Sequence, residues 1–385
     1  MLAALAVSLV LAAEPERALI TSPTEGPRVE PIEGPSEGEL QSAIDRGVAF
    51  LVEDQNANGS WGSATRTKSL NIFAPIPGSH DAFRSATTSL CVSALIETGG
   101  EVEGAAEALA KGEEWLLENL PAVRRATTVA IYNVWGHAYS IQALIRMHGR
   151  TDDADRKALI ERRIDEQIDR LVRYESVDGG WGYYDFDVGF QKPGSSSTSF
   201  VNGAALVALK EARDFGADVP QRLIDRGVAS TKRQRKPDFS YLYGEYLDQQ
   251  PMRGINNPGG SLGRSQACNI ALRMWGDEKV TDAVLSNWLH RLFARNGWLE
   301  IGRKRPVPHE SWMGVAGYFY YFGHYYGGLC IEALPDDQKP LFQAHMAELL
   351  LGQQETDGSW WDYPLYDYHQ PYGTAYALMT LVRCR

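Results

Sequence analysis

Two aspartates that are two positions apart are the first candidates for chemistry in this chain. Asp185 and Asp187 lie in the phrase Tyr-Tyr-Asp-Phe-Asp, and alternate residues of an extended loop point the same way. Two carboxylates that share a site hold one proton to a higher pH than an isolated carboxylate does, so the pair could act as a general acid. An ordinary solvated loop explains the same residues without any activity.

His309 is the second candidate, because its imidazole could act as a general base with Glu310 as its partner. Adjacent residues seldom face each other, however, and a solvated pair is the alternative. Asp362, Asp367 and His369 carry possible metal ligands, but all three come from one loop. The chain has no Cys-x-x-Cys and no Cys/His spacing typical of zinc. We therefore expect no metal and no cofactor.

Further residues could bind a ligand without reacting with it. They are polar residues that open apolar helices, or members of two tyrosine-rich stretches near residues 318–326 and 360–376. The faces of aromatic rings stabilise positive charge by roughly 0.5–2 kcal/mol each, which suits a cavity for an isoprenoid-like ligand. The same side chains could instead be core residues and fill the seams between helices. The candidate ligand-binding residues are His137, Asn202, Tyr318, Tyr325, Asp367, His369 and Tyr372.

A repeated phrase predicts the elements that position these residues. Residues 55–61 and 354–360 both read Q-x3-G-x-W, and residues 175–181 keep all of it except the Gln. A weaker copy ends at Trp298, and the intervals between the tryptophans indicate a period of about 60 residues. Two degraded copies then fall near residues 120–121 and 238–241. The chain therefore contains six repeated units.

Each unit reads as two helices of different character. The first has an apolar stripe, as at Ile164, Ile168 and Leu171, and an opposite charged face. The second is apolar nearly all round, as at residues 203–209 and 374–381, and is therefore buried. The pattern predicts an all-α (α/α)6 toroid with an inner ring of apolar helices and an outer ring of amphipathic ones. The long loops that follow the outer helices then share one end of the ring, where we expect the candidate residues to converge.

The Q-x3-G-x-W phrase resembles the repeat of squalene and oxidosqualene cyclases, and related repeats build the beta subunits of protein prenyltransferases. The resemblance covers about residues 41–385 and implies an α/α toroid with an apolar isoprenoid ligand. The reactive phrases of these proteins are absent. No inner helix opens with D-x-D-D-T-A, and residues 372–374 read Tyr-Gly-Thr where a prenyltransferase has Tyr-His-Thr with its zinc-binding histidine. The Cys-Gly-Glu-Gln phrase of complement thioester domains is absent too.

Composition limits the partners and the location of the protein. The net charge of -11 and the lack of a basic tract argue against nucleic-acid binding. Residues 1–13 are apolar and too short to cross a bilayer, so they are expected to be a signal peptide, and export to the periplasm or the extracellular space follows. Residues 14–40 contain much Pro, Gly, Glu and Ser and are expected to be a disordered linker. Residues 41–385 form the toroid domain.

Three functions remain open from the sequence alone. The first is a cyclase-like or transferase-like toroid that binds or transforms an apolar isoprenoid-like molecule. The second is a non-enzymatic scaffold that binds a protein partner. The third is a polysaccharide-active enzyme with paired carboxylates. A deep aromatic bore favours the first, a filled bore the second, and an open cleft with two acids about 5–10 Å apart the third.

Overall fold

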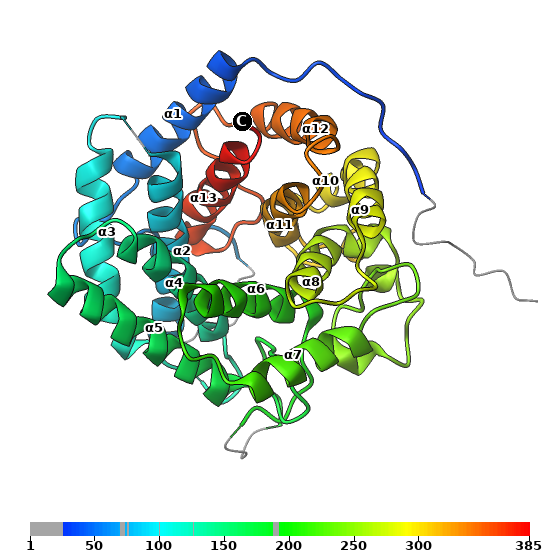
Figure 1. The fold of residues 1–385 in the computed structure, drawn as a ribbon, viewed down its shortest axis with the longest axis horizontal. Helices are drawn as coiled ribbons and strands as arrows, with labels where there is room; N and C mark the ends of the chain where they lie inside the picture. Colours follow the sequence, from blue (N-terminus) through cyan, green and yellow to red (C-terminus); the bar gives the residue numbers. More distant parts are fainter. Residues whose placement is uncertain (1–25, 70–73, 75–76, 100, 126, 188–191) are drawn as a thin grey trace, which may run out of the picture.

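The computed structural model describes residues 26–69, 74, 77–99, 101–125, 127–187 and 192–385. These residues form thirteen α-helices and no β-strand beyond isolated bridges. Twelve of the helices form six pairs, and Figure 1 shows them arranged around a ring. The outer members are α1 (Glu37–Glu53), α3 (Ala105–Asn119), α5 (Ala154–Tyr174), α7 (Gln221–Arg233), α9 (Asp282–Ala294) and α12 (Lys339–Leu351). The inner members are α2 (Pro77–Thr98), α4 (Asn133–His148), α6 (Ser199–Phe215), α8 (Leu262–Met274), α11 (Tyr320–Glu332) and α13 (His369–Val382), and α10 (Asn296–Glu300) is a short extra helix.

The inner helices close on themselves. Each packs against the next, in the order α2, α4, α6, α8, α11 and α13, and α13 packs against α2 again. The last inner helix also contacts α1, the first outer helix. The predicted (α/α)6 toroid is therefore confirmed, including the contact between its first and last units.

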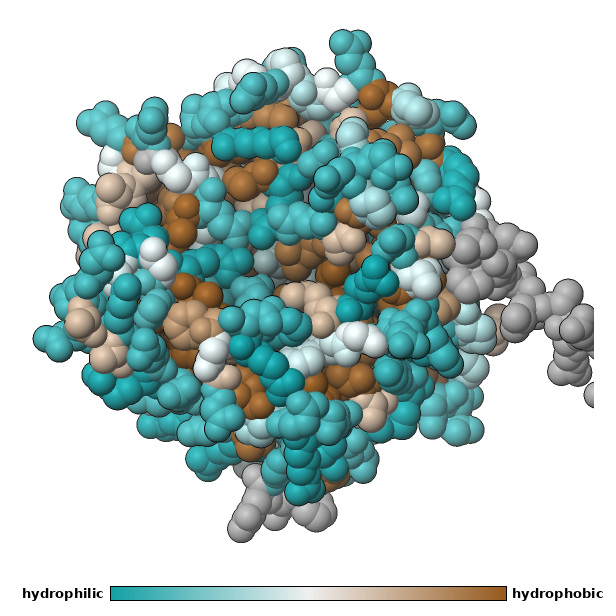
Figure 2. All heavy atoms as spheres, viewed as in Figure 1, coloured by the Kyte–Doolittle hydropathy of each residue, from teal (hydrophilic) through white to brown (hydrophobic). Residues whose placement is uncertain are grey.

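Burial follows the predicted difference between the two helix types. In α5 the buried residues form one stripe that includes Ile160, Ile164, Ile168 and Leu171, while the remaining face is charged. In α6 every residue from Ser199 to Leu209 is buried. Figure 2 shows one face of the ring, where hydrophilic side chains cover the periphery and apolar ones gather toward the hollowed centre. A helix without a polar face has to be enclosed, and the outer ring encloses it.

The repeated phrase forms a turn that fastens neighbouring units. Trp61, Trp181 and Trp360 are fully buried, and each indole N–H donates to a carbonyl in the outer helix of its own unit, at 2.7–2.9 Å. Gly59, Gly179 and Gly358 have φ near +90° and lie against the backbone of the next outer helix. These turns join units one and two, three and four, and six and one.

The weaker copies of the Q-x3-G-x-W phrase do not all form this turn. At residues 236–241 the turn is kept, because Phe239 adopts φ 62° in place of glycine and its N–H donates to the Lys236 carbonyl at 3.0 Å. The copy ending at Trp298 is not such a turn, because residues 296–298 belong to α10 and Trp298 packs against Gly259 while remaining partly exposed. Sequence spacing alone could not distinguish a helical Gly-Trp pair from a turn.

The N-terminal segment follows the outside of the ring. Helix α1 begins at Glu37 rather than at residue 41, where the toroid domain was expected to start. In the part of the expected linker that is described, the Val29 N–H donates to His290 Nδ1 at 3.2 Å, and the Glu30 carbonyl accepts from His345 Nε2 at 2.8 Å. Residues 26–36 thus lie along α9 and α12. The expected signal peptide, residues 1–13, lies outside the described residues, and among those described no helix is long and apolar enough to span a membrane.

Replacing Gly358 with alanine is expected to destabilise the fold by roughly 2–3 kcal/mol. Its φ is +88°, and an added Cβ atom would lie 2.5 Å from the Arg46 carbonyl oxygen. Gly38→Ala is the matched control, because Gly38 lies inside α1 with no atom within 4 Å of an added Cβ. Alanine favours the helix there by up to about 1 kcal/mol. Chemical denaturation of both variants measures the difference, and equal midpoints would contradict the assigned role of the turn.

Candidate functional site

An aromatic cavity of about 240 Å³ lies at the end of the ring that carries the long loops. Its walls come from the starts of α2, α4, α6, α11 and α13 and from the loops at residues 183–184, 308–309 and 362–369. The lining residues are Phe83, Ala86, Thr87, Tyr132, Trp135, Tyr139, Tyr183, Tyr184, Phe200, Pro308, His309, Tyr318, Phe319, Phe322, Asp362, Tyr363, Leu365, Tyr368, His369 and Tyr372. Units far apart in the chain thus contribute to one chamber.

The rings in this wall pack on one another and present faces and edges to the interior. Trp135 stacks on Tyr183 with 5.3 Å between ring centroids and on Phe200 with 6.0 Å. Phe83 stacks on Tyr132 at 4.9 Å. Such pairs fix the ring orientations, and ring faces attract positive charge. The chamber therefore suits an apolar ligand and, in addition, a positive charge that develops on it.

Asp362 is the sole carboxylate among the described lining residues. The residue is completely buried. One carboxyl oxygen accepts a hydrogen bond from the Tyr321 N–H at 3.1 Å, and the other, Oδ1, has no hydrogen-bond partner. Burial raises the pKa of Asp362 from 3.8 to about 7, although the nearby Arg303 acts in the opposite direction. Loss of water around the charged form is the larger effect, so a substantial fraction of this carboxyl group is still protonated near neutral pH.

A second polar feature is a hydrogen-bonded chain of three phenols and an imidazole, which we call the tyrosine–histidine chain. The Tyr183 and Tyr243 hydroxyls are hydrogen-bonded, the Tyr243 hydroxyl lies 3.2 Å from the Tyr318 hydroxyl, and the latter lies 3.2 Å from His309 Nε2. His309 Nδ1 lies 2.6 Å from the Gly314 carbonyl oxygen. All members except Tyr243 line the cavity, and Tyr243 is buried behind the wall.

Four of the residues predicted from the sequence line this cavity: His309, Tyr318, His369 and Tyr372. His369 Nδ1 donates to the Tyr366 carbonyl at 2.8 Å, and its ring meets Trp361 edge-on. The Tyr372 hydroxyl donates to the Tyr318 carbonyl at 3.2 Å. The loops of units five and six therefore converge, as expected from the repeat.

The paired acid expected at Asp185 and Asp187 is not formed. Asp185 is buried in an ion pair with Arg125 at 2.7 Å and accepts the N–H groups of Gly194 and Ser195, whereas Asp187 is exposed. Asp185 thus holds its own loop together, and the exposed Asp187 side chain is not part of this ion pair. Glu310 is also exposed and is not part of the cavity wall.

Three other candidates contribute to packing. His137 is fully buried between Gln167 and Asn133, and burial lowers its pKa to about 4, so it is a neutral core histidine. Asn202 accepts the Trp181 N–H at 2.6 Å and so fixes the motif turn. Asp367 accepts the Ser63 hydroxyl at 2.9 Å, between units six and one.

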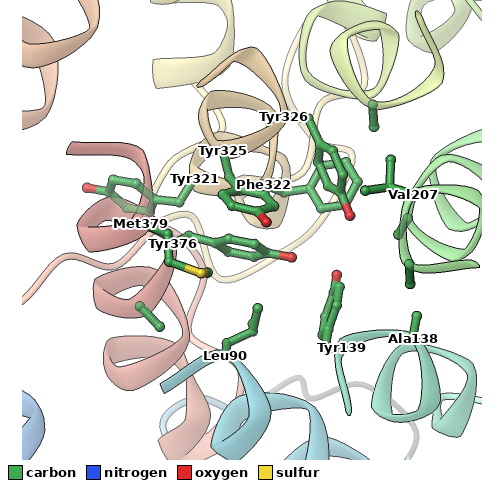
Figure 3. Packing of buried hydrophobic residues seen from close by; sticks show 14 of the residues in the cluster. Leu90, Ala138, Tyr139, Val207, Tyr321, Phe322, Tyr325, Tyr326, Tyr376 and Met379 are labelled. Atoms are coloured by element: carbon green, nitrogen blue, oxygen red, sulfur yellow. The ribbon is translucent and has the colours of Figure 1, made fainter. Parts of the chain in front are cut away.

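Tyr325 lies deeper in the ring, where tyrosines fill the bore. Figure 3 shows the rings of Tyr325 and Tyr326 from α11, Tyr376 from α13 and Tyr139 from α4 directed toward one another. At the far end, Arg146 bridges Glu97 at 2.7 Å and Glu211 at 3.0 Å, and Arg383 pairs with Glu97 and Glu332. Within the described residues the bore is thus filled below the cavity, which is the arrangement expected for a scaffold, whereas the aromatic cavity at its mouth leaves room for a ligand.

Sequence reasoning missed three parts of the site. It considered Asp362 only as a weak metal ligand, and it did not single out Trp135 or Tyr243. Asp362 lies two residues after the motif Trp360, where a loop turns back toward an inner helix, and this position was a possible signal in the sequence. Its burial, however, depends on aromatic rings from other units, which the local sequence does not show. Across the described part of the chain, no group of three or more His, Cys, Asp or Glu side chains is arranged to hold a metal ion.

Comparisons with known proteins support the fold. No protein-family model matches the chain, and no curated protein matches its sequence. Among solved structures, D-mannose isomerase aligns at 13% identity with a TM-score of 0.54, covering 90% of this chain and 96% of that one. An inactive variant of the α-1,6-mannanase GH76A of Salegentibacter sp. HEL1_6, in complex with α-1,6-mannotetrose, aligns at 12% identity and TM-score 0.51, covering 90% and 98%. The type II terpene cyclase MstE from Scytonema aligns at 16% identity and TM-score 0.49, covering 90% and 98%.

At these identities the likeness concerns the fold alone. The isomerase and the mannanase place the chain among α/α toroids, in agreement with its closed ring of helix pairs. They support the predicted α/α toroid, whereas no family model or sequence match supports the resemblance of the repeat to squalene cyclases and prenyltransferases.

Proposed function

We propose that this protein binds a small isoprenoid-like alkene in the aromatic cavity and isomerises it by protonation from Asp362. The observation that carries the proposal is a buried carboxyl group with one unpartnered oxygen in a chamber whose other described lining residues are mainly aromatic. Alkene protonation needs an acid that is still protonated at neutral pH and surroundings that stabilise a cation. Asp362 supplies the first, and the ring faces supply the second.

The size of the cavity indicates a short ligand. An apolar cavity of about 150 Å³ holds one benzene ring, so in proportion a cavity of this volume holds about ten carbon atoms. The chamber of about 240 Å³ thus suits a monoterpene-sized hydrocarbon. Squalene is too large for it. Export remains part of the proposal and rests on the apolar composition of residues 1–13 alone.

The polysaccharide-active alternative is less compatible with this cavity. Glycoside hydrolysis usually requires two carboxyl groups about 5–10 Å apart, and the described lining contains only Asp362. The likeness to a mannanase does not change this, because it concerns the fold. A scaffold function would leave the buried unpartnered oxygen of Asp362 without a role, although such a group costs roughly 1–3 kcal/mol.

Binding of the monoterpene myrcene is the direct test. Trp135 lines the cavity, so we expect saturable quenching of tryptophan fluorescence by myrcene and a rise in Tm as the ligand concentration increases. Ala86→Phe places a ring in the cavity and should abolish both effects, whereas squalene should produce neither effect with the wild type. Equal quenching of the wild type and Ala86→Phe, or no saturation at all, would refute the assigned ligand site.

A further inference from the structure

We infer that the tyrosine–histidine chain removes the proton that ends the reaction and carries it to the mouth of the cavity. The inference rests on the proposed function, because a cation formed from Asp362 has to lose a proton before a neutral alkene can leave. The chain begins in the cavity wall at Tyr183 and ends at His309, which is exposed at the rim. It thus connects the interior of the chamber with solvent.

The direction of the hydrogen bonds follows from its last member. A carbonyl oxygen only accepts, so His309 Nδ1, at 2.6 Å from the Gly314 oxygen, carries the hydrogen. Nε2 of the neutral ring is then an acceptor, and the Tyr318 hydroxyl donates to it across 3.2 Å. Since each phenol has one hydrogen, Tyr243 donates to Tyr318, and Tyr183 donates to Tyr243. Tyr183 lines the cavity, and as the first donor of the chain its oxygen can still accept a hydrogen.

The position of His309 is maintained against a conformational cost. Its φ of 64° lies in the left-handed region, which a histidine rarely adopts. Although His309 reaches solvent at the rim, loss of water around part of its ring lowers its pKa. The hydrogen bond to Gly314 acts in the opposite direction, and the guanidinium groups of Arg264 and Arg253 lower the pKa further, so the neutral ring can accept a proton. The same charges favour quick release of that proton to water. Arg264 also lies over the Tyr243 ring at 5.8 Å.

The reaction balances without another reagent. The Asp362 O–H bond breaks, its proton forms a new C–H bond with the alkene, and the π electrons leave a positive charge on the neighbouring carbon. After rearrangement, an adjacent C–H bond gives its electrons to a new C=C bond. Its proton goes to the Tyr183 oxygen, while each hydroxyl proton shifts one place along the chain and the last reaches His309 Nε2. The imidazolium then returns its proton, through water, to the Asp362 carboxylate.

Product analysis of single-residue variants tests the relay. With myrcene, we expect the wild type to release a hydrocarbon. In Tyr243→Phe and His309→Gln, Asp362 still starts the reaction, but hydrocarbon formation falls about a hundredfold and water captures the cation as an alcohol. His148→Gln is the control, because His148 lies at the opposite end of α4 and pairs with Glu161. Unchanged products in both relay variants would overturn the inference while leaving the acid in place.

A second measurement does not require turnover. Nitrogen NMR of the imidazole should show the Nδ1–H tautomer for His309 in the wild type, and a shift of the Nε2 resonance in Tyr318→Phe, which removes the donor. The Nε2–H tautomer would overturn the relay whatever the activity. If the wild type and Asp362→Asn both leave myrcene unchanged, the proposed function fails, and the relay fails with it.

Discussion

Asp362→Asn is expected to abolish turnover and to raise the thermal stability of the protein above pH 7. Asparagine keeps an oxygen for the Tyr321 N–H but has no acidic proton, so we expect the rate to fall by at least about 10³-fold. Ligand binding should persist, because the aromatic wall is unchanged. A variant that loses activity and gains stability identifies a group that is kept for catalysis at a cost in stability. Replacing a group whose role is structural would instead lower the stability.

The stability gain depends on pH in a defined way. The pKa of Asp362 is about 7 in the folded protein and 3.8 without burial. Below 3.8 both states are protonated and the aspartate carries no penalty. As pH rises to 7 the unfolded state loses its proton first, so stability falls, by roughly 4 kcal/mol in total. Differential scanning calorimetry should therefore show the variant more stable than the wild type at pH 8 and nearly equal at pH 4. The opposite order would contradict a raised pKa.

Truncation of a motif tryptophan is expected to cost roughly 3–5 kcal/mol of the free energy of unfolding. Trp61, Trp181 and Trp360 are each fully buried and lie at the junctions between units. Changing any one to alanine leaves a cavity and an unpaired carbonyl in the preceding outer helix. Urea denaturation measures the loss in each of the three variants.

Trp312→Ala is the matched control for this series, because Trp312 is 81% exposed. A surface truncation of this kind should change stability by at most about 0.5 kcal/mol. Near-wild-type stability of the three motif variants, accompanied by loss of ligand binding, would mean that these tryptophans belong to a ligand-binding site rather than to the packing between units. Close packing supports the role between units, because Cβ atoms added at Gly47 and Gly227 would lie within 3 Å of the rings of Trp360 and Trp181.

Sequence reasoning predicted the ring because the repeat carries the needed information locally. Period, apolar stripes and the Gly-x-Trp turn are properties of short segments, and a closed ring follows when six such units are joined. The convergence of the long loops was predicted for the same reason, and His309, Tyr318, His369 and Tyr372 do meet.

The sequence could not distinguish the surroundings of Asp185 from those of Asp362, for a physical reason. Asp185 and Asp362 both follow a motif tryptophan closely, but Arg125 from the unit-two loop neutralises the first, and rings from several units dehydrate the second. The pKa of a carboxyl group depends on these distant neighbours, which spacing does not reveal. A short separation in sequence between two acidic residues was therefore a poor guide to which carboxyl group has a raised pKa.

Closure of the ring has a consequence for the order of assembly. Contacts between α2 and the start of α13, such as Cys91 Sγ with the Pro371 carbonyl, join residues 280 positions apart. Closing so long a loop costs about 2 kcal/mol more than closing one of about 20 residues, and such distant contacts form late and slowly. Asp362 lies just before α13, so its dehydration is completed only at this step. Before the ring closes, Asp362 is expected to be an ordinary, ionised aspartate, and its carboxyl group gains the raised pKa only once the chamber is shut.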